Sequence, residues 1–306
     1  MIVFETILFA SAFFVLTLAP EFYSSLKELG AAFHAQKGSL AAMELLNEEF
    51  NQTSQTVSWG GNPIGKAPAL SLQQAVFQYE NGKSIGPLNI AIPARKTVAI
   101  IGPTGHGKTT ALYMLAGFIE LYRGQLCIDK YNQHEVLEQN WYDEMSFISQ
   151  SSFVFSGTVR DNLAMGKQFS DEEMVVSLVR AQLEQWLKDL PDGLDTKIGE
   201  GGIGLSGGEK QRIAIARAIV QKPSIVFFDE PTAGLDVFTE QMITKAIESL
   251  SHNATIVLVT HRYETLRYAD FIYCMEGGVV RASGTHLELL EDPLYKAMKH
   301  GGAVHE

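Results

Sequence analysis

Residues 102–110 read Gly-Pro-Thr-Gly-His-Gly-Lys-Thr-Thr, which fits the pattern Gly-x-x-x-x-Gly-Lys-[Ser/Thr]. The apolar run before this stretch (residues 97–101) predicts a buried strand, and residues 110–118 after it predict a helix. Between a strand and a helix, the backbone N–H groups of such a loop wrap a polyphosphate, assisted by the positive end of the helix. In that context Lys108 is placed to reach the β- and γ-phosphates and Thr109 to offer its hydroxyl to Mg²⁺. A glycine-rich turn with a chance lysine is the alternative, which this spacing disfavours.

A second apolar run ends in two acids, because residues 225–230 read Ile-Val-Phe-Phe-Asp-Glu. Asp229 at the carboxyl end of a predicted strand is suited to hold Mg²⁺, directly or through water. Glu230 beside it is placed to orient or deprotonate an attacking water. Alone, such a pair is more often a solvated turn, but beside a phosphate-binding loop the catalytic interpretation is favoured.

Residues 205–212 read Leu-Ser-Gly-Gly-Glu-Lys-Gln-Arg and open a helix predicted over residues 207–220. Ser206, Gly207 and Gly208 would offer a second set of phosphate-binding donors at the start of that helix. This stretch is a signature of ATP-binding cassette (ABC) proteins, and residues 70–295 resemble that family, with its motifs in order. The resemblance implies an α/β P-loop NTPase cassette with a RecA-like core, a helical subdomain and an antiparallel β subdomain.

Alternating strands and helices from residue 70 onward independently predict a largely parallel sheet with helices on both faces. The strands are predicted over residues 71–79, 88–92, 97–101, 125–128, 146–148, 225–229, 255–260, 271–275 and 279–282. Residues 171–190 are predicted to be mostly helical, and helices are predicted over residues 207–220 and 237–250.

The resemblance also assigns roles to single residues. Gln150 resembles the Q-loop glutamine, which touches Mg²⁺ and water and couples to the transport domain. Asp236 lies in the counterpart of the D-loop, and His261 resembles the switch histidine at the γ-phosphate. Tyr79 matches the A-loop aromatic position, where a ring stacks on adenine; a core-facing strand aromatic is the alternative.

In this family two cassettes enclose two ATP molecules, each held between the P-loop of one chain and the signature of the other. We therefore expect ATP and Mg²⁺ as cofactors and a second cassette as partner. The residues expected at the ATP held by this chain are Gly102, Pro103, Thr104, Gly105, His106, Gly107, Lys108, Thr109 and Thr110, with Tyr79. Those expected at the partner's ATP are Leu205, Ser206, Gly207, Gly208 and Glu209. The metal is assigned to Thr109, Gln150 and Asp229, and catalysis to Glu230, His261 and Gln150.

Three residues, at two places in the chain, depart from the usual family pattern. His106 stands where serine is common, and because the backbone carries the function there, we expect little loss. Arg95 and Lys96 replace a turn that usually contains glycine, with no consequence that the sequence predicts.

Two segments resemble the exporter branch of the family. Residues 155–163 read Phe-Ser-Gly-Thr-Val-Arg-Asp-Asn-Leu, like the segment after the exporter Q-loop. Glu200, just before the signature, resembles the X-loop acid that meets the coupling helices, so a coupling role is expected there.

The first residues are apolar. Residues 2–19 contain one charge, Glu5, and roughly 18 residues is the lower limit for crossing a bilayer. Lys27 and Lys37 follow the run and place its C-terminal side in the cytoplasm by the positive-inside rule. A signal peptide and a buried soluble helix are the alternatives to a membrane helix. Apolar spacing continues a helix over residues 21–50. We thus expect the end of a transmembrane domain (1–50), a linker (51–69), the cassette (70–295) and a tail (296–306).

Residues 18–35 resemble the end of the membrane domain in the CydD family, one half of the heterodimeric thiol exporters required for cytochrome bd assembly. This resemblance implies export of cysteine or glutathione, a CydC-like partner half-transporter, and a bacterial inner membrane with the cassette on its cytoplasmic side. Export of a lipid, peptide or drug is the alternative. Exporter halves carry six membrane helices and this chain has at most the last, so it is either truncated or completed by helices in trans. We expect ATP chemistry from it but no transport unaided.

Composition excludes other classes. A net charge of −11, from 24 Lys and Arg against 35 Asp and Glu, argues against a nucleic-acid partner. The two cysteines, Cys127 and Cys274, lie in apolar runs and are expected to be buried reduced thiols facing the cytosol. The eight histidines show no metal-ligand spacing. A soluble ABC ATPase acting on DNA or ribosomes is disfavoured by the charge and the apolar start, and a non-catalytic ATP-binding fragment by Gln150, Glu230 and His261.

Overall fold

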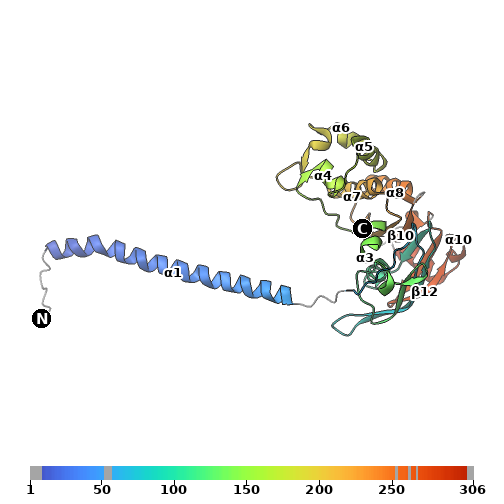
Figure 1. Cartoon of the computed structure of the whole chain (residues 1–306), viewed down its shortest axis with the longest axis horizontal. Helices are drawn as coiled ribbons and strands as arrows, with labels where there is room; N and C mark the ends of the chain where they lie inside the picture. The colour runs from blue at the N-terminus through green and yellow to red at the C-terminus, as the bar shows by residue number, and fades with distance from the viewer. Residues whose placement is uncertain (1–8, 52–56, 252–253, 261–262, 267, 302–306) are drawn as a thin grey trace. The chain divides into compact units, whose positions relative to one another are not determined.

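The computed structural model of the chain describes residues 9–51, 57–251, 254–260, 263–266 and 268–301 (Figure 1). The chain divides into two compact units, Met1–Thr56 and Val57–Glu306. The division falls inside the segment predicted as a linker. The described part of the first unit is helical, and all the described strands belong to the second unit.

The first unit is represented by one helix, α1 (Phe9–Asn51), of 43 residues. It confirms the helix predicted over residues 21–50, and at 1.5 Å per residue it is roughly 65 Å long. Several apolar side chains on it, among them Phe14, Leu16 and Phe33, are more than half exposed. Within the described ranges no helix combines the length and apolarity needed to cross a bilayer. Residues 2–8, where the predicted membrane helix begins, lie outside those ranges.

The central sheet of the second unit has six strands: β3 (Thr97–Ile101), β6 (Met145–Ile148), β9 (Ile225–Asp229), β10 (Thr255–Val259), β11 (Phe271–Glu276) and β12 (Val279–Gly284). Their order is β12-β11-β3-β10-β9-β6. All neighbours are parallel except β11 and β12, which confirms the predicted, largely parallel sheet. Every residue of β3, β9 and β10 is buried, and for that reason these strands are nearly continuous apolar runs in the sequence.

A second, antiparallel sheet contains β1 (Leu70–Gln78), β2 (Ser84–Ile92), β4 (Arg123–Ile128) and β5 (Tyr131–Asn132), in the order β2-β1-β4-β5. It is the antiparallel β subdomain implied by the family resemblance. β2 begins at Ser84, before the start predicted at residue 88. The prediction started later because Gly86 and Pro87 are a pair typical of turns, although they lie inside the strand. A separate two-stranded antiparallel sheet consists of β7 (Gly157–Thr158) and β8 (Lys197–Ile198).

The second unit also contains helices. They are α2 (Lys108–Ala116), α3 (Glu138–Glu144), α4 (Val159–Ala164), α5 (Asp171–Arg180), α6 (Glu184–Lys188), α7 (Gly207–Gln221), α8 (Val237–Ser251), α9 (Tyr263–Leu266), α10 (His286–Leu289) and α11 (Pro293–Gly301), with 3₁₀ turns η1 (Gln133–Glu135) and η2 (Gly193–Asp195). α2 begins two residues earlier than predicted and ends at Ala116, because Gly117, with a φ of 70°, caps it. Residues 171–190 were predicted to be mostly helical, which is confirmed: they form α5 and α6, separated where Gln182 has a left-handed φ of 60°.

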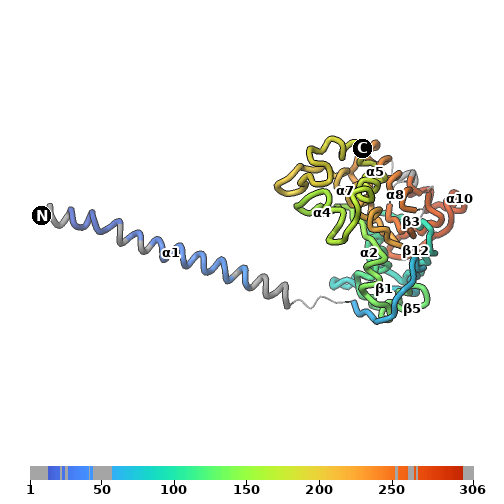
Figure 2. The backbone as a smooth tube through the Cα atoms, turned by 45° about the horizontal axis from the view of Figure 1, so that its top comes forward, coloured from blue at the N-terminus to red at the C-terminus, as the bar shows by residue number. Residues whose placement is uncertain are grey.

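Alternate residues of β9 point to opposite faces of the central sheet and divide the core into two clusters. Val226 and Phe228 pack with residues of α7 and α8, whereas Ile225 and Phe227 pack with residues of α2 and β1. Helices α4, α5 and α7 gather apart from β1 and β5 (Figure 2) and form the helical subdomain. The sheet therefore lies between two differently built layers, and its carboxyl edge is where both meet.

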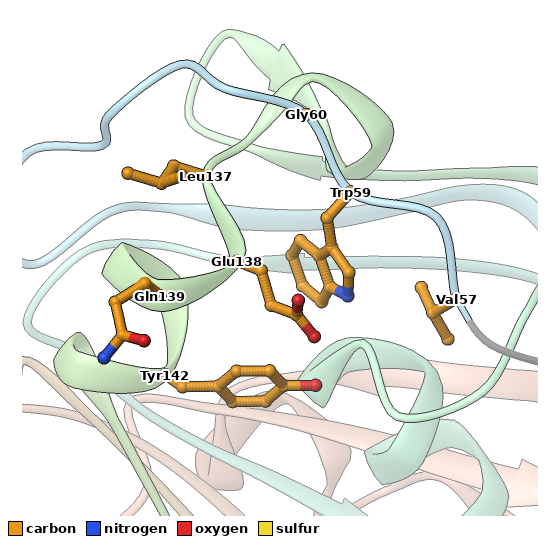
Figure 3. Close-up of a pocket in the computed structure, with 7 residues that line it drawn as sticks. All are labelled: Val57, Trp59, Gly60, Leu137, Glu138, Gln139 and Tyr142. Carbon is orange, nitrogen blue, oxygen red and sulfur yellow. The ribbon is translucent and has the colours of Figure 1, made fainter.

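Part of the predicted linker belongs to the second unit and packs within it. Residues 60 and 62 form parallel bridges with residues 137 and 136. The ring of Trp59 lies so close to Gly117 that a Cβ there would approach it to 3.0 Å. Figure 3 shows Trp59, Glu138 and Tyr142 around a hollow of about 450 Å³. The residues expected at ATP, the metal and the signature do not line this hollow, so the candidate site lies elsewhere.

Candidate functional site

The phosphate-binding loop connects β3 to α2, and two of its glycines are required by their surroundings. A Cβ on Gly102 would lie 2.3 Å from the carbonyl oxygen of Met275 in β11. Gly107 has a φ of 89°, and a Cβ there would lie 2.7 Å from Cδ1 of Ile85. Both positions exclude a side chain, because β2 and β11 press directly against the loop.

Lys108 is the first residue of α2 and is only 5% exposed. Its Nζ donates a hydrogen bond to the carbonyl oxygen of Pro103 over 3.1 Å and lies 3.6 Å from Oε1 of Glu230. The ammonium group is thus held against its own loop and faces Glu230, which follows β9, two strands away from β3 in the sheet. A buried cation in a loop of backbone donors suits a polyphosphate.

Thr109 and Asp229 meet although they are far apart in the chain. Thr109 Oγ1 donates to Asp229 Oδ1 over 3.0 Å. Asp229 is 7% exposed, and its burial raises the pKa of the carboxyl group, as does Glu230, against the lowering effects of Thr109 and Lys108. A hydroxyl and a carboxylate side by side are oxygen ligands of the kind Mg²⁺ prefers, and Mg²⁺ bound to nucleotides typically takes one or two carboxylates plus phosphate oxygens. The pair therefore fits the metal that the family resemblance implies.

Glu230 follows β9 with a left-handed φ of 46°, and its N–H donates to the carbonyl oxygen of Val259 over 2.9 Å. This turn directs the chain away from the sheet edge just after Asp229. Gln150 lies at the same edge, because β6 pairs with β9 in the register Ile148 with Phe228, and its side chain is exposed. His261 lies outside the described residues; Thr260 at the end of β10 is the last described position before it.

The signature residues form the start of α7. The Ser206 hydroxyl accepts a hydrogen bond from the N–H of Glu209, and the Glu209 carboxylate accepts one from the N–H of Ser206 over 2.7 Å. This reciprocal capping box fixes the helix terminus. Leu205 packs against the core of the helical subdomain, whereas Ser206 and Gly207 are exposed. Of the donors predicted at this terminus, Ser206 and Gly207 are exposed, whereas Gly208 is buried and the N–H of Ser206 is engaged by Glu209.

Asp236, predicted in the D-loop, precedes α8. Its carboxylate accepts hydrogen bonds from the N–H and the hydroxyl of Thr239, at 3.0 and 2.7 Å, and these bonds lower its pKa. Thr239 also lies against the signature, since a Cβ on Gly208 would come within 2.4 Å of its methyl carbon. The structure thus brings the signature and the D-loop together.

Tyr79 follows β1 and is held on two sides. Its ring meets that of Phe77 edge to face with centroids 4.9 Å apart, and its hydroxyl group hydrogen-bonds with Oγ1 of Thr110 in α2. The structure therefore places the predicted adenine-stacking residue over the helix that follows the phosphate-binding loop.

His106 has a contact that was not predicted. Its Nδ1 accepts a hydrogen bond from the N–H of Gly277, in the turn between β11 and β12, over 3.1 Å. From the sequence only a backbone role was expected at this position. The side chain additionally ties the tip of the loop to the central sheet.

Glu200 is exposed and follows β8. Its carbonyl oxygen accepts a hydrogen bond from the hydroxyl of Ser156 over 2.7 Å, which joins it to the segment after the predicted Q-loop. Two aromatic side chains of that segment, Phe153 and Phe155, are also exposed, and the Arg217 guanidinium lies 5.6 Å from the ring centre of Phe155. The two segments singled out as exporter-like thus form one surface.

Gln211 was missed by the sequence analysis. It is 2% exposed in α7; its Nε2 donates to the carbonyl oxygen of Ser149 over 3.3 Å, and its Oε1 accepts from the hydroxyl of Ser152 over 2.6 Å. It therefore joins the signature helix to both sides of Gln150. The residue stood within the quoted signature, but only backbone donors were considered there.

Comparison with known proteins agrees with this site. Residues 85–233 match the ABC transporter family. The second unit therefore belongs to that family, whose members are ATPases that couple ATP hydrolysis to transport.

Individual relatives are exporters. The chain is 34% identical over 292 residues to the glutathione/L-cysteine transport system ATP-binding/permease protein CydD of Haemophilus influenzae, covering 93% of this chain and 49% of that protein. It is 35% identical over 236 residues to the ATP-dependent lipid A-core flippase of Francisella tularensis subsp. holarctica, covering 76% of this chain and 39% of that protein. The chain thus spans about half or less of the length of these curated relatives.

A solved structure is similar as well. A bacterial Atm1-family ABC exporter with ATP bound matches with a TM-score of 0.76 at 30% identity, covering 95% of this chain and 52% of that one. These similarities are consistent with the C-terminal part of an ABC exporter.

Proposed function

We propose that this chain binds and hydrolyses ATP as the nucleotide-binding part of an ABC exporter. The observation that carries the proposal is the joint placement of four groups at the carboxyl edge of the sheet. Lys108 lies 3.6 Å from Glu230, and Thr109 hydrogen-bonds Asp229. In the proposed site Lys108 and the loop N–H groups bind the phosphates, Thr109, Asp229 and Gln150 hold Mg²⁺, and Glu230 activates water.

The proposed active site is composite. Ser206 and Gly207 are exposed at the start of α7, where the helix offers free N–H groups and a positive end to an anion outside this chain. The ATP on which they act is held by a second cassette, and His261 completes the site on the ATP held here. A CydC-like half-transporter is the proposed partner.

A substitution of Glu230 tests this proposal. Glu230→Gln keeps the shape of the side chain but removes the base, so ATP is expected to remain bound and hold two cassettes together. Hydrolysis is expected to fall by about a hundredfold or more, within the range for loss of a general base. The measurement combines phosphate release with the mass of the complex by light scattering, with and without ATP. A variant that hydrolyses ATP at the parent rate and stays monomeric in ATP would contradict the proposed role.

The proposed substrate is a small thiol, cysteine or glutathione, exported across a bacterial inner membrane in support of cytochrome bd assembly. The similarity to CydD supports it, since that alignment covers 93% of this chain, whereas the flippase alignment covers 76%. Export of a lipid or drug is the second candidate, because the identity to the flippase, 35%, and to a putative multidrug exporter of Staphylococcus aureus, 33%, is as high.

Transport in inverted vesicles separates these candidates. Vesicles carrying this chain together with a CydC-like partner are expected to take up labelled cysteine or glutathione when ATP is added, and to lose the uptake with Glu230→Gln. ATP-dependent movement of a labelled lipid or of ethidium, without thiol uptake, would establish the second candidate instead.

A further inference from the structure

A buried guanidinium group lies beneath the signature. Arg212, in the second turn of α7, is 9% exposed. Its Nη1 is 3.7 Å from Sδ of Met242, a weak acceptor, and its Nε is buried without a hydrogen-bond partner among the residues that the structure describes. Buried polar groups are almost always paired, so this one requires a reason.

The nearest negative charges do not neutralise Arg212 by direct pairing. Glu209 and Asp236 are the carboxylates that act on it through space, and they oppose the burial that lowers its pKa. Both are engaged elsewhere: Glu209 accepts from Ser206, and Asp236 accepts from Thr239. A buried cation without a bonded anion usually destabilises a fold.

Arg212 also lies where two helices begin. Its Nη1 would be 3.5 Å from a Cβ on Gly208, in the first turn of α7. The same Gly208 is pressed against Thr239, in the first turn of α8. Helix N-termini carry partial positive charge, so the two helix termini and the guanidinium group repel one another in the single chain. An anion arriving at the exposed Ser206 and Gly207 would be attracted by all three.

We propose that Arg212 is a positioning residue for the ATP held by the partner cassette. Its charge, lying behind Gly208, strengthens the attraction of the α7 terminus for the terminal phosphate without touching it. This inference rests on the proposed composite site. It implies that Arg212 lowers the stability of the single chain while favouring the ATP-bound pair.

The test uses the full chain in detergent with Glu230→Gln, so that ATP is retained. Arg212→Met keeps much of the side-chain volume and the contact with Met242 but removes the charge; Arg212→Lys keeps the charge. Arg212→Gln serves as the uncharged variant if the methionine variant does not fold. Lys245→Met, on the exposed side of α8, removes the same charge elsewhere. Association with a CydC-like partner in ATP is measured by analytical ultracentrifugation, ATP affinity of the single chain with a fluorescent ATP analogue, and the unfolding temperature without nucleotide.

Arg212→Met is expected to weaken ATP-dependent association about tenfold, which corresponds to about 1.4 kcal/mol. The lysine variant is expected to recover part of the loss, and Lys245→Met to change little. ATP affinity of the single chain is expected to be unchanged, and the unfolding temperature of Arg212→Met equal to or above that of the parent. Two results would overturn this inference but not the composite site. One is unchanged association of Arg212→Met; the other is a lower unfolding temperature of Arg212→Met together with no recovery of association in Arg212→Lys. Failure of the Arg212-intact parent to associate with that partner in ATP would overturn the composite site and the inference with it.

Discussion

Thr109 Oγ1 donates a hydrogen bond to Asp229 Oδ1 over 3.0 Å, although 120 positions of sequence separate the two residues. The bond joins the first turn of α2 to the last residue of β9. It holds the carboxylate at the sheet edge in a place that is nearly closed to solvent, and burial there raises the pKa of Asp229. The ionised carboxylate that would bind a cation therefore lowers the stability of the single chain.

Asp229→Asn is therefore expected to raise the unfolding temperature at neutral pH. Because the pKa of Asp229 is higher in the folded state than in the unfolded chain, its ionised form destabilises the fold once the pH rises above the unfolded value, about 4. The advantage of the asparagine variant should shrink as the pH falls from 8 toward 4. Differential scanning fluorimetry over that range checks it, and a gap independent of pH would refute it.

Asp236→Asn is the matched control with the opposite sign. Hydrogen bonds from Thr239 lower the pKa of Asp236, so its ionised form stabilises the fold above the unfolded pKa. This variant is expected to be less stable than the parent at neutral pH, and the difference should close as the pH falls through the lowered pKa.

Gly107→Ala is expected to destabilise the protein more than Gly105→Ala. Both glycines have positive φ, 89° and 79°, so each substitution costs about 1–2 kcal/mol of backbone strain. Only at Gly107 does the new methyl group also collide, with Ile85; around Gly105 the Cβ position is open. Urea unfolding measures the two costs. Equal losses would show that Ile85 moves aside freely, and adding Ile85→Ala should remove part of the excess.

Ser206→Ala is expected to cost about 1 kcal/mol of stability through loss of the α7 cap. Ser170→Ala removes an equivalent capping box at α5 and serves as the control. Only Ser206→Ala should also lower the ATPase rate of the paired cassettes, while leaving ATP affinity of the single chain unchanged. Equal ATPase rates in the two variants would separate Ser206 from the proposed composite site.

The thiol of Cys274 is expected to resist alkylation in the folded protein. It is buried in β11, and burial raises its pKa to about 12, so no thiolate is present near pH 8. Mass spectrometry after iodoacetamide treatment should find Cys274 modified only after guanidinium unfolding. Modification in the native protein at the rate of a free thiol would refute this.

Local sequence predicts a strand or helix well where a single physical requirement, such as burial on both faces, determines its residues. β3 and β9 were predicted with their observed bounds because strands buried on both faces are apolar throughout. Residues 171–190 are mostly helical as predicted, but the break between α5 and α6 was not located, because it depends on the left-handed turn at Gln182. The predicted strand started too late, at residue 88, because Gly86 and Pro87 resemble a turn in sequence, whereas in the structure they lie inside β2 between the paired residues Ile85 and Leu88.

The candidate site was predictable to the extent that it depends on strand ends. Asp229 and the loop before Lys108 follow parallel strands, and such ends share one sheet edge. The contact of His106 with Gly277 spans 171 positions and depends on where the β11–β12 turn lies, which no local pattern encodes. The buried ends of Gln211 and Arg212 escaped prediction likewise, because a helical pattern indicates which face is buried but not what it meets.

The two bonds of Gln211 imply a reciprocity. Because one amide group holds both Ser149 and Ser152, the start of α7 and the segment around Gln150 share a common free-energy balance. Any event at Gln150 that favours one position of α7 must itself be favoured, by the same amount, when α7 takes that position. The coupling at this contact therefore has no preferred direction: a change around Gln150 alters the free energy of the start of α7 by the same amount as the reverse.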